Sequence, residues 1–402
     1  MANVSSSNGL EKRPKLRFPG FDEPYKQCRI GDIYAERSQR GASDMELLSV
    51  TMNDGVMPRS EIEGKDNSSE DKSNYKVVLT GDMVYNSMRM WQGANGISPC
   101  DGIVSPAYTV LMPKIPICNG YFAAFFKSPN LINEFRKNSQ GMTSDTWNLK
   151  YPQIETIKVC IPALSEQNRV ADMLGTLERR IAKQVQLVDS LKKYKRGVMQ
   201  HIFRQLPSQN GAEWTCVRLG DIFKKVSRRN TDGVIKNVIT NSAEYGLIPQ
   251  RDFFDKDIAV DGNTANYYVI ENGDFVYNPR KSNSAPYGPF NRYTLSEQGI
   301  ISPLYTCLVL QADISPSYLA WYFKSDAWYR YIYDNGSQGV RHDRVSMTDD
   351  LLMGIPVMYP SHVKQLLYAD ILDMVEARLQ ATQKTLELLS KTRDGYMRQL
   401  FI

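Results

Sequence analysis

The side chains best able to do chemistry are scattered along this chain. His201 lies in a long helical pattern, and His342 lies between charged residues in the segment RHDR. We expect His201 to be a solvated or packed helix residue and His342 to have a surface role beside arginines, rather than general-base catalysis. The adjacent carboxylates Asp349 and Asp350 follow Thr348, a pattern typical of a helix start. These residues therefore do not predict a clustered acidic metal site.

Catalytic motifs are also missing. The sequence contains no GxxxxGK[ST] phosphate loop, no HExxH and no GxSxG, and the segment GKDNSSEDK at 64–72 lacks a phosphate-cradling pattern. It has no asparagine- or aspartate-Pro-Pro-aromatic tetrapeptide of the kind found in amino-methyltransferases. The six cysteines form no CxxC pair. We expect a non-catalytic chain with no catalytic residues and no metal or cofactor of its own.

Composition bounds the class of protein. The chain has 402 residues, 42% hydrophobic and 23% charged, which predicts two to three globular domains. No apolar run is long enough for a membrane span, and the N-terminus has no signal-peptide core. Scattered thiols suit a reducing compartment, so we expect a cytoplasmic protein. The net charge of +5 is compatible with nucleic-acid binding but is a weak indication alone.

One long helix is predicted at Ser165–Leu206. Its apolar residues recur at alternating spacings of three and four, as in a coiled-coil seam. The seam residues are Leu174, Leu177, Ile181, Val188, Leu191, Val198 and Ile202. Two positions on the seam are polar, Gln184 and Lys195.

The same pattern returns 198 residues later. The equivalent seam residues are Leu372, Val375, Leu379, Leu386, Leu389, Tyr396 and Leu400. Thr382 and Arg393 occupy the two polar positions, and 162–203 matches 360–401 at 12 of 42 positions. Two such helices can bury their seams against each other. The polar seam residues are then candidates to fix the register of the pair, although they could instead reach water where the coil splays.

The segments between the helices repeat as well. GDMVYN at 81–86 is echoed by GDFVYN at 273–278, and GIVSPAYTVL at 102–111 by GIISPLYTCL at 299–308. Mixed strand and helix patterns predict an α+β fold with mostly antiparallel, twisted sheet and short helices. The tandem duplication predicts an N-terminal arm at 1–24, a domain at 25–161, a helix at 162–207, a second domain at 208–359 and a second helix at 360–402.

Taken together, these motifs resemble the specificity subunit of type I restriction-modification systems. The resemblance rests on PKLRFPGF at 14–21, GDMVYNSMRMWQGANGIS, DGIVSPAY and the GIP at 354–356, in this order with two long helices. It implies two target recognition domains separated by an antiparallel coiled coil. Each domain would read one half of a bipartite double-stranded DNA target. Two methyltransferase subunits and two restriction-translocation subunits would be partners, and those partners would bind S-adenosylmethionine, ATP and Mg.

With this function in view, the loops richest in donors and acceptors become candidates for base contact. In the first domain they are Asn86, Ser87, Arg89, Trp91, Gln92, Asn95, Thr143 and Ser144. In the second they are Asn278, Arg280, Lys281, Ser282, Asn283, Arg341, His342 and Arg344. The scaffold repeats while these residues differ, which predicts an asymmetric target. A two-headed adaptor unrelated to restriction and a self-sufficient modification enzyme are the alternatives.

Overall fold

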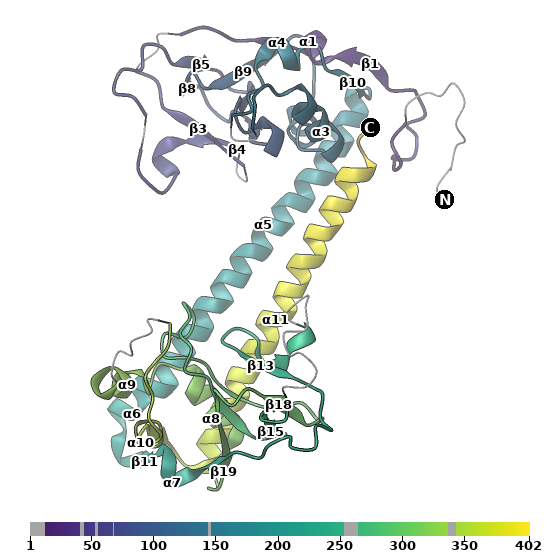
Figure 1. Ribbon diagram of the computed structural model, residues 1–402. Helices are drawn as coiled ribbons and strands as arrows, with labels where there is room; N and C mark the ends of the chain where they lie inside the picture. The colour runs from purple at the N-terminus through teal and green to yellow at the C-terminus, as the bar shows by residue number, and fades with distance from the viewer. Residues whose placement is uncertain are drawn as a thin grey trace. The chain divides into compact units, whose positions relative to one another are not determined.

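The computed structural model describes residues 13–40, 44–52, 55–66, 68–143, 146–252, 264–336 and 343–402 (Figure 1). The chain divides into two compact units. Unit 1 comprises Met1–Gln186 with Gln383–Ile402, and unit 2 comprises Leu187–Thr382. Each long helix therefore contributes one part to each unit. No helix among the described residues has the length and apolar character needed to cross a membrane.

Unit 1 is built from short strands and helices. The strands are β1 (Lys26–Arg29), β2 (Tyr34–Glu36), β3 (Leu48–Thr51), β4 (Gly55–Pro58), β5 (Lys76–Val78), β6 (Met83–Asn86), β7 (Asn95–Ile97), β8 (Gly102–Val104), β9 (Tyr108–Pro113) and β10 (Lys158–Ile161). The helices are α1 (Ile30–Ile33), η1 (Arg59–Glu61), η2 (Met90–Gln92), α2 (Asn119–Phe125), α3 (Pro129–Asn138), α4 (Tyr151–Ile154) and the long α5 (Leu164–Gln200).

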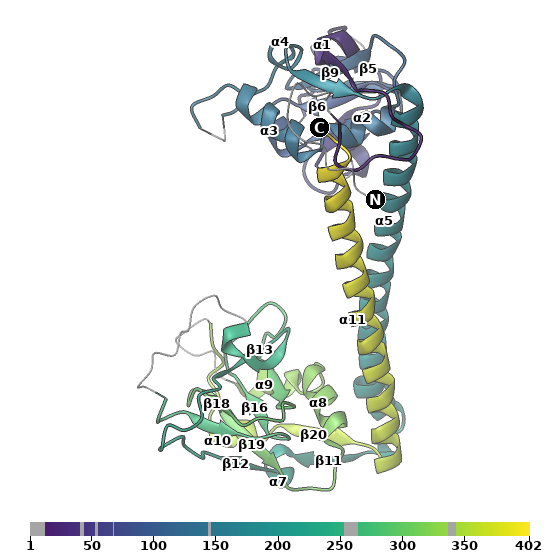
Figure 2. The same cartoon turned by 90° about the vertical axis from the view of Figure 1, so that its right-hand side faces the viewer.

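Unit 2 repeats this order. Its strands are β11 (Thr215–Arg218), β12 (Phe223–Val226), β13 (Ile239–Ser242), β14 (Gly246–Pro249), β15 (Tyr268–Ile270), β16 (Phe275–Tyr277), β17 (Phe290–Arg292), β18 (Gly299–Ile301), β19 (Thr306–Leu310) and β20 (Pro356–Tyr359). Its helices are η3 (His201–Gln205), α6 (Leu206–Gln209), η4 (Gly211–Glu213), α7 (Leu219–Ile222), η5 (Gln250–Asp252), α8 (Pro316–Lys324), α9 (Tyr329–Asn335), α10 (Asp349–Met353) and α11 (His362–Gln399), which follows β20 (Figure 2).

Strand pairing is the same in both units. A four-stranded sheet has the order β2-β9-β6-β7 in unit 1 and β12-β19-β16-β17 in unit 2. Three two-stranded pairs accompany each one: β1-β10, β3-β4 and β5-β8, matched by β11-β20, β13-β14 and β15-β18. All of these pairs are antiparallel. The predicted α+β class is confirmed, with the sheet split into several small pieces.

The helix seam is confirmed within each unit. In unit 1, Leu174 near the start of α5 shares a core with Leu400 and Phe401 at the end of α11. In unit 2, Ile202 near the end of the first long helix shares a core with Leu372 near the start of α11. The start of one helix thus meets the end of the other in both units, so the pairing is antiparallel.

The first long helix differs from the prediction near its end. Its α-helical hydrogen bonding stops at Gln200 and widens to a π-helix over His201–Gln205. The added residue in the turn changes the direction of the side chains that follow. Here the consecutive residues Ile202 and Phe203 are both buried in the core of unit 2. The prediction of one regular helix to Leu206 is corrected to an α-helix followed by a π turn.

A buried glutamine joins each long helix to its domain. Gln167 donates to the carbonyl of Pro162 at 3.0 Å and accepts the backbone N–H of Cys118 at 3.0 Å. Gln365 makes the same two bonds, to Pro360 at 2.9 Å and from Ser315 at 2.8 Å. Both side chains are almost fully buried. Because a buried amide needs partners for both of its ends, this bond pair fixes the start of each long helix against the N-terminus of α2 or α8.

Candidate nucleic-acid interface

The repeated Gly-Asp pair shapes the turn that leads into each candidate loop. Gly81 and Gly273 have positive φ angles of 91° and 98°, which glycine adopts without steric cost. Asp82 accepts the backbone N–H of Leu79 at 2.9 Å, and Asp274 does the same for Glu271. An arginine, Arg37 or Arg228 respectively, pairs with each aspartate. This turn therefore sets the direction of β6 and β16, whose ends carry the candidate residues.

An asparagine at the end of each strand holds the loop that follows. The Oδ1 of Asn86 accepts the backbone N–H of Met88 at 3.0 Å, and the Oδ1 of Asn278 accepts that of Arg280 at 3.0 Å. In both cases the side chain forms an Asx turn by accepting the backbone N–H of the residue two positions later. Asn278 is 6% exposed and also donates to the carbonyl of Asn241. Asn278 thus positions the loop and has little exposed surface, and base contact by this residue stays a prediction.

Two further predicted residues of unit 1 lie inside the domain. Ser87 is 6% exposed, and its hydroxyl hydrogen-bonds that of Thr109 at 2.9 Å. Asn95 is fully buried and donates to the carbonyls of Gly93 and Phe126. In this structure Ser87 and Asn95 bond their own domain, and contact with DNA stays a prediction for both.

The accessible part of this loop is aromatic and basic. Arg89 is exposed, whereas Trp91 and Gln92 are half-buried, and Arg89 donates to Gln92 at 3.4 Å. The indole of Trp91 meets that of Trp147 edge to face, with ring centroids 5.2 Å apart. The guanidinium of Arg136, on α3, lies 5.8 Å from the Trp91 ring centroid. The sequence reasoning missed Trp147 and Arg136, because only the fold brings α3 and the 146–149 segment to this loop.

The second candidate stretch of unit 1 lies beside the first. The backbone N–H of Leu149 donates to the carbonyl of Ser87 at 2.9 Å. Thr143 is exposed, and its backbone carbonyl accepts the hydroxyl of Thr146 at 2.9 Å. Ser144 lies outside the described residues. The structure thus joins two loops that are more than fifty residues apart in sequence.

Unit 2 joins its two stretches in the same way. The backbone N–H of Val345 donates to the carbonyl of Pro279 at 2.9 Å, and that of Lys281 donates to Asp343 at 2.8 Å. These bonds make Arg280 and Arg344 directly opposed partners of an antiparallel bridge. The predicted residues Arg341 and His342 lie outside the described residues.

The rest of the unit 2 loop turns on itself. Ser282 and Ala285 exchange backbone hydrogen bonds of 3.0 and 3.2 Å, and the Ser282 hydroxyl accepts the Ala285 N–H as well. Ser282 and Asn283 are exposed. Beneath the loop, Asn291 donates to the Oδ1 of Asn241 at 2.7 Å, and both are buried. The sequence reasoning missed this asparagine pair, which fixes the strands that carry the loop.

The polar seam positions carry ion pairs. Lys195 on α5 pairs with Glu376 on α11 in unit 2, and Arg393 on α11 pairs with Glu178 on α5 in unit 1 at 3.8 Å. Glu178 and Glu376 are equivalent positions, as are Lys195 and Arg393, so the duplication repeats one interhelical pair. Burial would raise the pKa of Glu376, but the Lys195 ammonium outweighs it and lowers that pKa.

The other two polar seam positions, Thr382 and Gln184, carry no charge. The Thr382 hydroxyl is buried and donates to the carbonyl of Arg378 at 2.7 Å, one turn earlier on its own helix. Gln184 is half-buried on α5. The register role of these two residues stays a prediction.

Solved structures share this fold over nearly its whole length. The S subunit of a type I restriction-modification system from M. genitalium matches 97% of this chain and 99% of its own, with a TM-score of 0.58 and 14% identity. A chain from a study of complex assembly and conformational transition in the type I system matches 96% and 99%, with a TM-score of 0.55 and 16% identity. The HsdS subunit from Thermoanaerobacter tengcongensis matches 98% and 99%, with a TM-score of 0.50 and 15% identity. No protein-family model matches the chain.

The chain has the S-subunit fold. Within this fold, the paired loops of the two units present different exposed side chains. Unit 1 presents Arg89, Trp91 and Gln92, and unit 2 presents Arg280, Lys281 and Asn283. These types are the ones that hydrogen-bond base edges and stack on flat rings.

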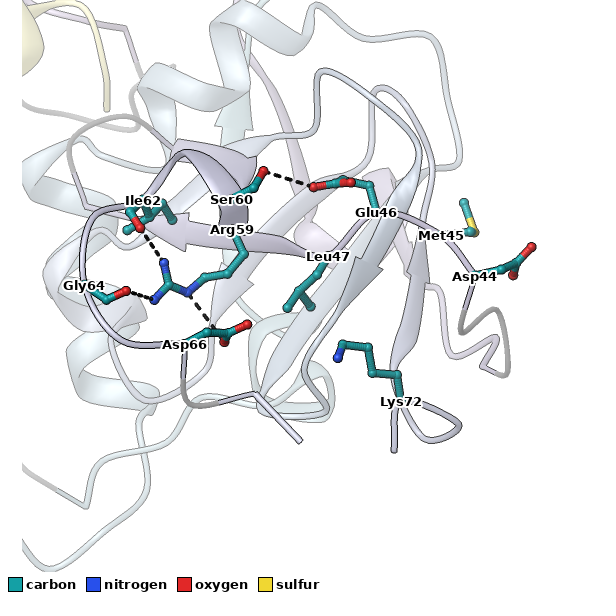
Figure 3. A pocket seen from close by; sticks show the side chains of 10 residues that line it. All are labelled: Asp44, Met45, Glu46, Leu47, Arg59, Ser60, Ile62, Gly64, Asp66 and Lys72. Atoms are coloured by element: carbon teal, nitrogen blue, oxygen red, sulfur yellow. Dashed lines mark hydrogen bonds and ion pairs between the residues drawn. The ribbon is translucent and has the colours of Figure 1, made fainter. Parts of the chain in front are cut away.

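A pocket of about 470 Å³ in unit 1 lies elsewhere in this S-subunit fold (Figure 3). It is lined by residues of 44–47 and 59–66 and by Lys72. Arg59 holds its wall by donating to the carbonyls of Ile62 at 2.7 Å and Gly64 at 3.1 Å, and it lies 3.7 Å from Asp66 (Figure 3). These contacts occupy the guanidinium of Arg59 and pair it with the carboxylate of Asp66. Among the described residues, no group of three or more His, Cys, Asp or Glu is placed to hold a metal ion.

Proposed function

We propose that this protein is the DNA-specificity subunit of a type I restriction-modification complex and that each unit reads one half of an asymmetric bipartite target. One observation carries the proposal. The two units repeat a single scaffold, down to the Asn86 and Asn278 turns, yet present different exposed side chains at the same place. Because hydrogen-bonding side chains determine which base is read, a repeated frame with different readers suits two different half-sites.

The long helices support a spacer role. The 37 residues of α5 extend about 55 Å at 1.5 Å per residue. One turn of DNA is about 34–36 Å, so a helix of this length exceeds the separation of half-sites one turn apart. In this proposal, the Lys195–Glu376 and Arg393–Glu178 pairs fix the helix register and with it the spacing of the two readers.

Methyl transfer and ATP-dependent restriction belong, in this proposal, to two methyltransferase and two restriction-translocation subunits. Those partners bind S-adenosylmethionine, ATP and Mg. One docking surface is suggested by α11, where Val363, Leu367 and Met374 are 77%, 53% and 65% exposed. Their spacing of four and seven places them on one side of the helix, opposite the buried Leu372. Exposed apolar rows of this kind mark protein interaction sites.

The reading role of unit 1 can be tested by methylome sequencing. Cells would carry this chain with its methyltransferase partner, as wild type or with Arg89, Trp91 and Gln92 changed to alanine. One half of the methylated motif should become degenerate, because the donors that select its bases are gone, while the other half stays fixed. Alanine at Glu134, which is half-buried on α3 and pairs with Lys137, is a control that should leave the motif unchanged. An unaltered motif in the triple variant would reject the assignment.

The docking surface has its own test. Serine at Val363, Leu367 and Met374 should weaken association with the methyltransferase subunit by about tenfold or more, since burial of each large apolar side chain is worth about 1.5–3 kcal/mol. The control is alanine at the equivalent α5 positions Ser165 and Thr176. Titration of purified partner subunit, followed by analytical ultracentrifugation, measures the effect. Equal affinity of the wild type and the serine variant would place the partner on a different surface.

A further inference from the structure

Two arginines face each other across a short β-ribbon in unit 2. Residues 279–281 and 343–345 run antiparallel, and Arg280 and Arg344 are directly opposed. Side chains at opposed positions project from the same face of a ribbon, with Cβ atoms about 4.5–5.5 Å apart. Two like charges at this separation destabilise the pair unless an anion or an acceptor lies between or above them.

The described residues supply little compensation. Arg344 lies 3.9 Å from its neighbour Asp343, a pair in which both side chains are more than a third exposed. Within the described part of the chain, Arg280 makes no ion pair, and Lys281 beside it adds another positive charge. Burial raises the pKa of the Tyr305 hydroxyl, and the charges of Arg280 and Arg344 oppose that rise.

The ribbon is also held in place from below. The Oδ1 of Asn278 fixes the backbone N–H of Arg280, and the Nδ2 of Asn278 is anchored to Asn241. Asn241 is bonded in turn to Asn291, and all three asparagines are buried. Two arginines held on a fixed backbone lose less conformational entropy on binding than two arginines on a free surface loop do.

We propose that this ribbon enters the DNA major groove and that Arg280 and Arg344 read guanine in the half-site of unit 2. This inference rests on the proposed function. The major groove admits a two-stranded ribbon, and guanine there offers two acceptors, O6 and N7, which match the arginine fork. Acceptors placed above the pair would also remove the like-charge cost described above.

Unit 1 has no such pair at the equivalent place. The bond from Leu149 to Ser87 corresponds to the bond from Val345 to Pro279. In this register, Met88 and Asn148 take the places of Arg280 and Arg344. The guanine requirement is therefore assigned to one half-site only, and Met88 offers an internal control on the same scaffold.

The test compares methylomes of cells that carry the full chain and its methyltransferase, with Arg280→Ala, Arg280→Lys, Arg344→Ala or Met88→Ala. The wild-type motif should contain guanine, on either strand, in the half-site of unit 2. Each arginine-to-alanine change should lower discrimination at one G·C pair by about 10- to 100-fold and leave the other half-site unchanged. Arg280→Lys should lose most of this discrimination too, because an ammonium cannot form the fork. Met88→Ala should leave the unit 2 half-site intact.

Three results would overturn the inference. The first is a motif whose unit 2 half-site contains no guanine. The second is full specificity in Arg280→Lys together with a uniform loss over all sequences in Arg280→Ala, which would indicate a phosphate contact. The third is a changed base in the half-site of unit 1 when Arg280 or Arg344 is replaced. A wild-type chain that supports no sequence-specific methylation at all would instead reject the proposed function itself, before any variant is compared.

Discussion

Replacing Phe401 with alanine is expected to lower the free energy of unfolding of unit 1 by about 3–5 kcal/mol. Phe401 is 3% exposed, although it is the penultimate residue of the chain. Its ring lies 5.5 Å from that of Phe125 and 5.4 Å from that of Tyr121, both on α2. Removing the ring leaves a cavity between the end of α11 and the first domain, and the surrounding helices can close it only partly.

The duplication supplies the matched comparison. Phe203 occupies the equivalent position in unit 2, where its ring lies 5.6 Å from Tyr318 and 5.8 Å from Tyr322 on α8. In scanning calorimetry of the full chain, Phe401→Ala should lower the unfolding temperature of unit 1, and Phe203→Ala should lower that of unit 2. Leu388→Ala, at a site 57% exposed on α11, should shift neither. If Phe401→Ala unfolds at the same temperature as the wild type, the Phe401 ring does not stabilise the core of unit 1.

The second large effect is expected when the charges of Lys195 and Glu376 are changed, because this alters the stability of unit 2. Lys195→Glu alone should destabilise unit 2 by about 2 kcal/mol, between the values for exposed and buried pairs. It would place two carboxylates together, near Asp373, which accepts the indole N–H of Trp321 at 2.8 Å. The double variant Lys195→Glu with Glu376→Lys should regain about half or more of the loss, since it restores opposite charges.

Thermal unfolding of the two single variants and the double variant measures this coupling. The pH dependence has a defined sign. Because the folded-state pKa of Glu376 lies below its ordinary value of 4.5, the pair contributes fully above that value. Its contribution is lost as the pH falls through the lowered pKa. Additive effects in the double variant would contradict an interhelical register pair. So would a stability difference between the wild type and Lys195→Glu that persists unchanged at low pH.

Periodic and local features were predictable from the sequence. The helix seam depends on apolar spacing alone, and its residues Leu174 and Leu372 are buried. The helix start at Asp349 is confirmed, with Thr348 as its cap. Strand partners were less accessible, because pairing is decided by contacts remote in sequence. The strands flanking Gly81 are not partners of each other: β5 pairs with β8, and β6 with β7 and β9.

The candidate loops were located from sequence, but their residues were not sorted. Polar type alone could not separate Arg89, which faces solvent, from Asn95, which is fully buried. The amide of Asn95 serves the carbonyls of its own domain, a use that no local pattern reveals. Trp147 was missed for the converse reason, because its neighbour Trp91 lies more than fifty residues away in sequence.

The antiparallel helix pair gives each unit a composite ancestry. Unit 1 takes its last core residues, Leu400 and Phe401, from the repeat that otherwise builds unit 2. Unit 1 is therefore discontinuous in sequence, whereas unit 2 is the continuous segment Leu187–Thr382. A recombination event that exchanged the globular part of one unit would preserve both cores only if its breakpoints spared the helices and the buried glutamines Gln167 and Gln365. The stretch between the two long helices is therefore the segment that can be exchanged with the least disruption of the helix pair.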